Sequence, residues 1–106
     1  LLNNRLSATV NETLYLHAAG EAAESIAQQR DLKLATVYGH FSEAIESGLL
    51  DVRDVLPLSD VQYNEIVAAV ELLSVCEQGT LKPLYEALEG EYDYGMLKCV
   101  VTAVCA

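Results

Sequence analysis

AAESIAQQRDLKLATVYGHFSEAIESG, residues 22–48, decides the fold of this chain of 106 residues. Its apolar positions indicate two short helices joined by a tight turn. Ile26 and Ala27 mark the buried side of the first helix, and Leu32 and Leu34 fall in the turn. A small residue such as Ala27 is needed there, because two helices that cross steeply after so few residues leave little room. The stretch predicts a helix-turn-helix.

The second helix of this motif has one apolar stripe and ends at Gly48, which suits a left-handed position after a helix. The stripe follows the i, i+4, i+7, i+8 spacing of an amphipathic helix and consists of Val37, Phe41, Ala44 and Ile45. We expect the residues turned away from it to face outward: Thr36, Tyr38, Gly39, His40, Ser42 and Glu43. In a DNA-binding version of the motif such positions enter the major groove.

Composition and length favour one all-α domain. The chain is 52% hydrophobic, with one Phe, no Trp and two Pro, which fits helices better than a sandwich or barrel. We expect a compact bundle of five to seven short helices, with residues 1–8 as a lead-in or linker and residues 9–106 as the domain. The chain opens with Leu1 and shows no signal-peptide pattern, so we expect a fragment of a longer protein.

Local signals place the other helices. Ser7 or Thr9 is expected to cap a first helix that ends near Gly20, with His17 as a packing or partly exposed residue rather than a metal ligand. Residues 51–56 are expected to form a short acidic helical turn and not a β-hairpin wing. Ser59 and Gln62 match a capping box at the start of the next helix.

The C-terminal part is expected to hold two more helices. Residues 77–79 are assigned to a loop, and Thr80 to the cap of a helix that tolerates Pro83 in its first turn. The last helix is expected to begin at Tyr94 or Gly95, because its apolar residues recur at i, i+3, i+4 and i+7. These residues are Leu97, Val100, Val101 and Val104.

Charge and cysteine usage limit the classes of function. Six Lys and Arg stand against sixteen Asp and Glu, a formal net charge of -10, which is the wrong sign for a free-standing nucleic-acid binder. Cys76, Cys99 and Cys105 form no CxxC pair, so we expect reduced, apolar thiols of a cytosolic protein. No run of about eighteen apolar residues occurs, so no membrane partner is expected.

Two segments together resemble a known family. The chain is similar to the helix-turn-helix domain near the C-terminus of RecQ-family DNA helicases, the Werner type and related bacterial proteins included. The similar segments are SIAQQRDLKLATVYGHFSEAIESGLLDVRDVL, followed by LKPLYEAL and EYDYGMLKCVVTAV. The similarity covers about residues 13–103. The first segment alone also resembles the DNA-reading domains of LuxR-type regulators, and the ordered succession of the segments points to RecQ. The matching residues are Ile26, Ala27, Leu32, Thr36, Val37, His40, Phe41, Leu81, Lys82, Pro83, Leu84, Leu88, Tyr94 and Leu97.

The resemblance implies an accessory domain of an ATP-dependent 3′-to-5′ DNA helicase that acts in recombination and repair, in the bacterial cytosol or nucleoid. The chain has no phosphate-binding G-x-x-x-x-G-K-[ST] loop and no zinc-binding cysteine set. We therefore expect no cofactor, metal site or catalytic residue in this fragment, with ATP and Mg²⁺ bound by the parent helicase.

Direct DNA contact, if the domain makes it, is expected to be weak and independent of sequence. The outward face of the second helix lacks Arg, Lys, Asn and Gln, which make bidentate contacts with bases, and it includes Glu43. The candidate nucleic-acid-binding residues are Arg30, Lys33, Thr36, Tyr38 and His40, with Arg5 as a further cation. Arg30 and Lys33 would hold phosphate, Thr36 would donate to phosphate at a helix N-terminus, and Tyr38 would stack on an unpaired base.

Each of these residues also has a purely structural interpretation. Arg30 and Lys33 suit a solvated turn, and His40 suits packing beside the apolar stripe with a hydrogen bond to a neighbouring element. Two other classes of function are alternatives to the helicase accessory domain. One is an acidic module that binds a basic protein or other domains of the parent helicase without DNA contact, and the other is an enzyme fragment. The enzyme class is disfavoured, because no carboxylate pair stands beside His or Cys as acid, base or nucleophile.

Overall fold

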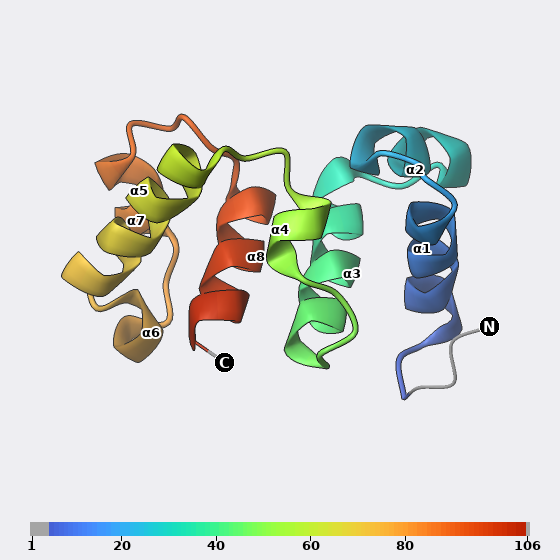
Figure 1. Ribbon diagram of the computed structural model, residues 1–106, viewed down its shortest axis with the longest axis horizontal. Coiled ribbons are helices and arrows are strands. Elements are labelled where there is room, and N and C mark those ends of the chain that lie inside the picture. Colours follow the sequence, from blue (N-terminus) through green and yellow to red (C-terminus); the bar gives the residue numbers. More distant parts are fainter. Residues whose placement is uncertain (1–4, 106) are drawn as a thin grey trace.

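The computed structural model describes residues 5–105, which form eight α-helices and no strand. The all-α class is confirmed, with one helix more than the upper number expected (Figure 1). Residues 1–4 of the expected lead-in, residues 1–8, lie outside the described part. The first helix begins at Ala8, the last residue of that lead-in. The helices are α1 (Ala8–Ala18), α2 (Ala23–Arg30), α3 (Leu34–Glu46), α4 (Val52–Val55), α5 (Asp60–Leu72), α6 (Val75–Gln78), α7 (Lys82–Ala87) and α8 (Tyr94–Cys105).

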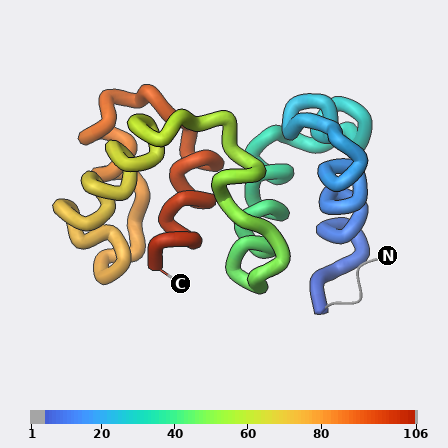
Figure 2. The backbone as a smooth tube through the Cα atoms, viewed as in Figure 1, coloured from blue at the N-terminus to red at the C-terminus, as the bar shows by residue number. Residues whose placement is uncertain are grey.

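Helices α3 and α8 lie side by side at the centre of the molecule. Figure 2 shows the chain starting at one end with α1 and α2, crossing to the other end with α5, α6 and α7, and returning to the middle with α8. Helix α3 therefore has neighbours on two sides: α1 and α2 on one, and α8 on the other. A helix in this position needs side chains that are apolar, or polar and hydrogen-bonded, around most of its circumference.

Close packing and side-chain hydrogen bonds join α3 to α8. The hydroxyls of Ser42 and Thr102 share a hydrogen bond of 2.7 Å, and the thiol of Cys99 donates to the carbonyl oxygen of Tyr38 at 3.4 Å. A Cβ atom added at Gly95 would meet Tyr38 Cδ2 at 2.7 Å. The interface therefore requires a residue without a side chain at position 95.

Several helix ends confirm the sequence-based predictions. The Ser7 hydroxyl caps α1, and Ser59 and Gln62 form the complete capping box of α5. Gly48 follows α3 with φ of 79°, the left-handed conformation expected of it. The last helix begins at Tyr94, as predicted.

Three other boundaries differ from the predictions, and at α6 the difference comes from two left-handed residues that flank the helix. Residues 77–79 were assigned to a loop, but Val75–Gln78 is a single helical turn between Ser74 and Gly79, both with positive φ. Thr80 does not cap α7, whose N-cap is Leu81 with no side-chain hydrogen bond. Leu34 is the first residue of α3 rather than part of the turn.

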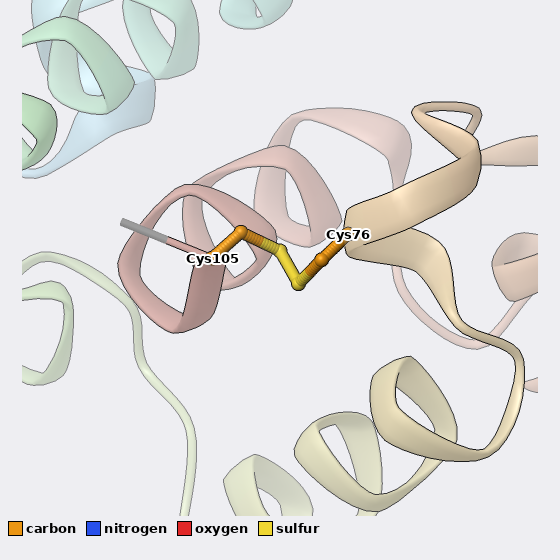
Figure 3. Close-up of a disulfide and its surroundings, with 2 residues drawn as sticks. All are labelled: Cys76 and Cys105. Carbon is orange, nitrogen blue, oxygen red and sulfur yellow. A yellow bond between two sulfur atoms is a disulfide. The ribbon is translucent and has the colours of Figure 1, made fainter.

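Two of the three cysteines form a disulfide, so the prediction of three reduced thiols is wrong. Cys76 in α6 and Cys105 at the end of α8 are bonded with their Cα atoms 5.5 Å apart (Figure 3). They are 29 residues apart in sequence and meet only because α6 packs beside α8. Cys99 is the apolar thiol that was expected: it is fully buried, and burial raises its pKa to about 12. Within residues 5–105, no helix has the length and apolar character needed to cross a bilayer.

We predict that Gly95→Ala destabilises the domain although alanine favours helices. The new methyl group would overlap Tyr38, and such overpacking costs about 1–3 kcal/mol of unfolding free energy. Gly39→Ala is the matched control, because a Cβ atom at Gly39 in α3 meets nothing within 4 Å. This control should gain up to about 1 kcal/mol from helix propensity. Urea unfolding of both variants measures the difference, and equal stability of the two would contradict the packing described here.

Candidate nucleic-acid interface

The helix-turn-helix consists of α2, the turn at residues 31–33, and α3. Asp31 ends α2 in the left-handed conformation with φ of 54°, and the N–H of Leu32 donates to the Ala27 carbonyl at 2.8 Å. Ile26 and Ala27 are buried, as the sequence predicts for the first helix of the motif. Ala27 and Leu32, which the sequence pattern singled out, thus take part in the turn, whereas the left-handed Asp31 was not predicted.

The prediction that Tyr38, His40 and Ser42 face outward is wrong. These three residues of α3 are only 3%, 7% and 5% exposed. The prediction assumed one buried stripe, whereas α8 covers a second side of α3 that includes Tyr38 and Ser42, and α1 covers His40. The exposed part of α3 is a narrow strip that consists of Ala35, Thr36, Glu43 and Glu46.

Tyr38 lies where it has no face free to stack on a base. Its ring packs edge-to-face with Phe41, with ring centroids 6.2 Å apart, and its Cβ, Cγ and Cδ2 atoms lie against Gly95. Burial raises the pKa of Tyr38 to about 12, and Glu24 adds to the shift. The base-stacking role considered for Tyr38 therefore does not fit this geometry.

His40 is part of a buried hydrogen-bonded chain that links three helices. Its Nδ1 atom lies 2.7 Å from the hydroxyl oxygen of Thr13 in α1, and that same oxygen accepts from Arg30 Nη1 at 2.6 Å. The hydroxyl oxygen accepts from Arg30 with one lone pair, and the tautomer of His40 determines which of Nδ1 and the Thr13 hydroxyl donates in the second hydrogen bond. The structural interpretation of His40, a packed residue bonded to a neighbouring element, is confirmed.

The surroundings of His40 favour its neutral form. Burial lowers the pKa of His40 below its ordinary value of 6.5, and the charge of Arg30 acts in the same direction. Glu43 acts in the opposite direction. A protonated His40 would bring a second positive charge beside Arg30 in a buried position.

Arg30 joins α2 to α1 instead of projecting into solvent. Its guanidinium donates to the Thr9 carbonyl oxygen at 2.6 Å and to the Thr9 hydroxyl at 2.9 Å, in addition to Thr13. It also forms an ion pair with Glu12 at 3.1 Å, and its side chain is 13% exposed. To bind phosphate, Arg30 would have to give up these partners.

Lys33 and Thr36 are the two candidate residues that the structure leaves exposed together. Both lie at the N-terminus of α3, where Lys33 is the N-cap residue and no side chain caps the helix. A helix N-terminus with a lysine suits a phosphate group. Arg5, which precedes α1, is also exposed. Farther along α3, the exposed strip carries the two acidic residues Glu43 and Glu46.

Other polar features of this region do not suit a phosphate or a metal. A cleft of about 360 Å³ lies between α1, α2 and α4, but Glu21, Glu24 and Asp54 line it and would repel phosphate. His17, which also lines the cleft, packs edge-to-face on Phe41 at 5.2 Å, as expected for a packing histidine. Within residues 5–105, no three His, Cys, Asp or Glu side chains are grouped to hold a metal ion.

Thr13 is the important residue that the sequence analysis missed. It is fully buried and connects Arg30 with His40, although threonine is unremarkable on an amphipathic helix. The available signal was its position three residues after Val10 and next to Leu14, on the buried side of α1. A polar residue at such a position needs a partner, which predicts a hydrogen bond but not its identity.

Comparisons with known proteins identify the same motif. The model of a family described as "Helix-turn-helix domain" matches residues 9–101. No curated protein and no solved structure matches the chain significantly. The family match therefore covers both the helix-turn-helix and the helices α4 to α7 that follow it, together with most of α8.

We predict that the stability of the domain falls as the pH drops below 6.5. Because the pKa of His40 is lower in the folded than in the unfolded chain, its contribution is fully present above the unfolded value. That contribution is lost as the pH falls from 6.5 toward the folded pKa. Urea unfolding at pH 7.5 and pH 5 measures the change.

Two variants separate the contribution of His40 to this loss of stability from that of the carboxylates, which also titrate in acid. His40→Gln should show a smaller loss of stability between the two pH values than the wild type. His17→Gln leaves the hydrogen bonds among Arg30, Thr13 and His40 in place. This variant should therefore retain the part of the stability loss that His40 causes. If His40→Gln loses as much stability between pH 7.5 and pH 5 as the wild type does, His40 is not buried in its neutral form.

Proposed function

This chain belongs to the helix-turn-helix domain family, and from that premise we propose that it is an accessory domain of a RecQ-type ATP-dependent DNA helicase. The domain positions DNA and neighbouring domains of the parent enzyme during unwinding in recombination and repair. It is not itself catalytic, and ATP and Mg²⁺ belong to the parent chain. The resemblance of residues 13–103 to the C-terminal region of such helicases supports this assignment.

The enclosure of α3 is the observation that carries the proposed role. A helix that reads bases needs an open face with donors and acceptors, which in this chain would include Tyr38, His40 and Ser42. All three are buried, and the exposed strip of α3 includes Glu43 and Glu46. The motif therefore serves mainly as a scaffold, and the proposal excludes recognition of a specific DNA sequence.

The proposed DNA contact is confined to the turn before α3. Lys33 and Thr36 are exposed there, beside backbone N–H groups of the first helical turn. They would hold one phosphate without reading bases. The overall charge of -10 keeps this contact weak, because the rest of the surface repels the DNA backbone.

The distribution of charge favours a second candidate function, an acidic protein-interaction module without DNA contact. Residues 57–93 contain eight Asp and Glu and a single Lys, a net charge of -7 out of the total of -10. The carboxylates are Asp60, Glu65, Glu71, Glu77, Glu86, Glu89, Glu91 and Asp93. Such a region attracts a basic protein or a basic domain of the parent helicase.

Fluorescence anisotropy with a labelled forked DNA tests the proposed DNA contact. We predict binding no tighter than about micromolar at about 50 mM salt, the same for unrelated sequences, and its loss near 200 mM salt. Lys33→Glu should abolish this binding, because it reverses the charge beside the helix N-terminus. Lys82→Glu makes the same change in α7, at the other end of the molecule, and should reduce binding much less.

Two results would contradict the proposal. Tight, sequence-dependent binding that survives 200 mM salt would mean that α3 opens to read bases. Absence of binding even at 50 mM salt would remove the DNA contact and leave the protein-interaction module as the function.

A further inference from the structure

Helix α5 exposes an apolar stripe at the end of the molecule opposite α1. Leu72 is 85% exposed and Val61 79%, the two highest values among the large apolar side chains that are exposed in residues 5–105. They are 11 residues apart, which is about three helical turns, so both lie on one face of α5. Ala68, also exposed, falls between them on the same face, and the exposed Glu65 lies there between Val61 and Ala68.

The stripe lies opposite the side of α5 that packs on the domain. Ile66 and Val70 are 0% and 1% exposed and form the buried side of the helix. The domain core is therefore complete without Val61 and Leu72. Single exposed apolar residues are common on protein surfaces, whereas Val61, Ala68 and Leu72 are three exposed apolar residues on one face of α5.

The surroundings of this stripe are strongly acidic. The charged residues of α5 are Asp60, Glu65 and Glu71, with no Lys or Arg in the helix. The hydroxyl of Tyr92 donates to Glu65 at 3.1 Å, which holds the acidic link at residues 89–93 beside α5. Asp60 is neutralised by its ion pair with Arg53, but the region of residues 57–93 keeps its large negative charge.

We propose that the outer face of α5, formed by Val61, Ala68 and Leu72, is the docking site for a basic amphipathic helix of a partner protein. The partner would place one apolar stripe on these residues and Lys or Arg side chains against the surrounding carboxylates. A helix fits because the exposed positions follow the spacing of helix-in-groove and helix-pair contacts. A basic one fits because the charges attract it and orient its approach.

A second copy of this chain does not fit the same surface. Joining two copies through α5 would bring together two regions that each carry a net charge of -7. The repulsion would oppose burial of so few apolar side chains. The occupant is therefore a protein segment of opposite charge.

The surrounding structure holds α5 ready for such a partner. Its N-terminus is fixed by the capping box, and the Arg53 guanidinium lies over the Tyr63 ring at 4.7 Å. The disulfide between Cys76 and Cys105 ties the next helix, α6, to α8 (Figure 3). A rigid surface loses little conformational entropy on binding.

The site is distinct from the helix-turn-helix, whose α2 lies at the opposite end of the molecule and whose α3 lies at its centre (Figure 1). The inference rests on the second candidate function, to which it gives a location and a class of partner. It is tested with a peptide and with variants of α5. Its failure is therefore distinguishable from failure of the DNA contact, which is tested with variants of Lys33.

Fluorescence anisotropy with a labelled synthetic helix tests the proposal. The probe is a Leu/Lys peptide of about 18 residues with Leu at the heptad a and d positions, and the control peptide has the same composition in scrambled order. We expect the whole domain to bind the probe at physiological salt at least about tenfold more tightly than the scrambled peptide. The double variant Val61→Ser/Leu72→Ser should lose about tenfold in affinity for the probe.

Tyr15→Ser is the matched control, because Tyr15 is 61% exposed on α1, far from α5. Its affinity for the probe should equal that of the wild type. Equal affinities of the double variant and the Tyr15→Ser variant would overturn the proposal, since binding would then reflect charge alone. Sedimentation of the wild type as a dimer that the double variant dissociates would also overturn it, because a second copy would then cover α5.

Discussion

The hydroxyl of Thr13 connects the three helices at the N-terminal end of the molecule. It shares a hydrogen bond with His40 in α3 and accepts from Arg30 in α2, while Arg30 also bonds to Thr9 in α1. Each of these polar groups is paired, and within residues 5–105 no buried side-chain nitrogen or oxygen lacks a partner. Because an unpaired buried group costs about 1–3 kcal/mol, these hydrogen bonds favour the rotation of α3 that keeps His40 against α1. In that orientation Tyr38 faces α8, which buries it, and Thr36 stays exposed.

Sequence reasoning succeeded where the cause of the structure is local. The capping box of Ser59 and Gln62 and the left-handed Gly48 depend on a few neighbouring residues and are confirmed. It failed where the cause is distant in sequence. His40 and Ser42 are buried by partners 27 residues before and 60 residues after them, and Cys76 meets Cys105 through the packing of α6 on α8. An amphipathic pattern reveals one buried side of a helix, but it cannot reveal that a later helix covers a second side.

The two ends of the molecule differ in what their surfaces can bind. The helix-turn-helix end offers Lys33 and Thr36, a small site suited to one phosphate. The α5 end combines most of the negative charge with the exposed Val61 and Leu72, which suits a basic apolar partner. The proposed DNA contact at one end and the proposed protein partner at the other would let the domain position the two relative to each other. The central pair of α3 and α8 is the rigid connection between these ends.

Hydrogen exchange of the α3 amides, measured with and without forked DNA, tests the central claim that α3 is an enclosed structural helix. Amides that open only when the whole domain unfolds exchange with the global unfolding free energy. We predict this behaviour for residues 38–45, unchanged by DNA, with any protection caused by DNA limited to residues 33–36. Fast exchange at Tyr38, His40 and Ser42, or strong protection of these residues by DNA, would contradict the account, because α3 would then be free to enter a DNA groove.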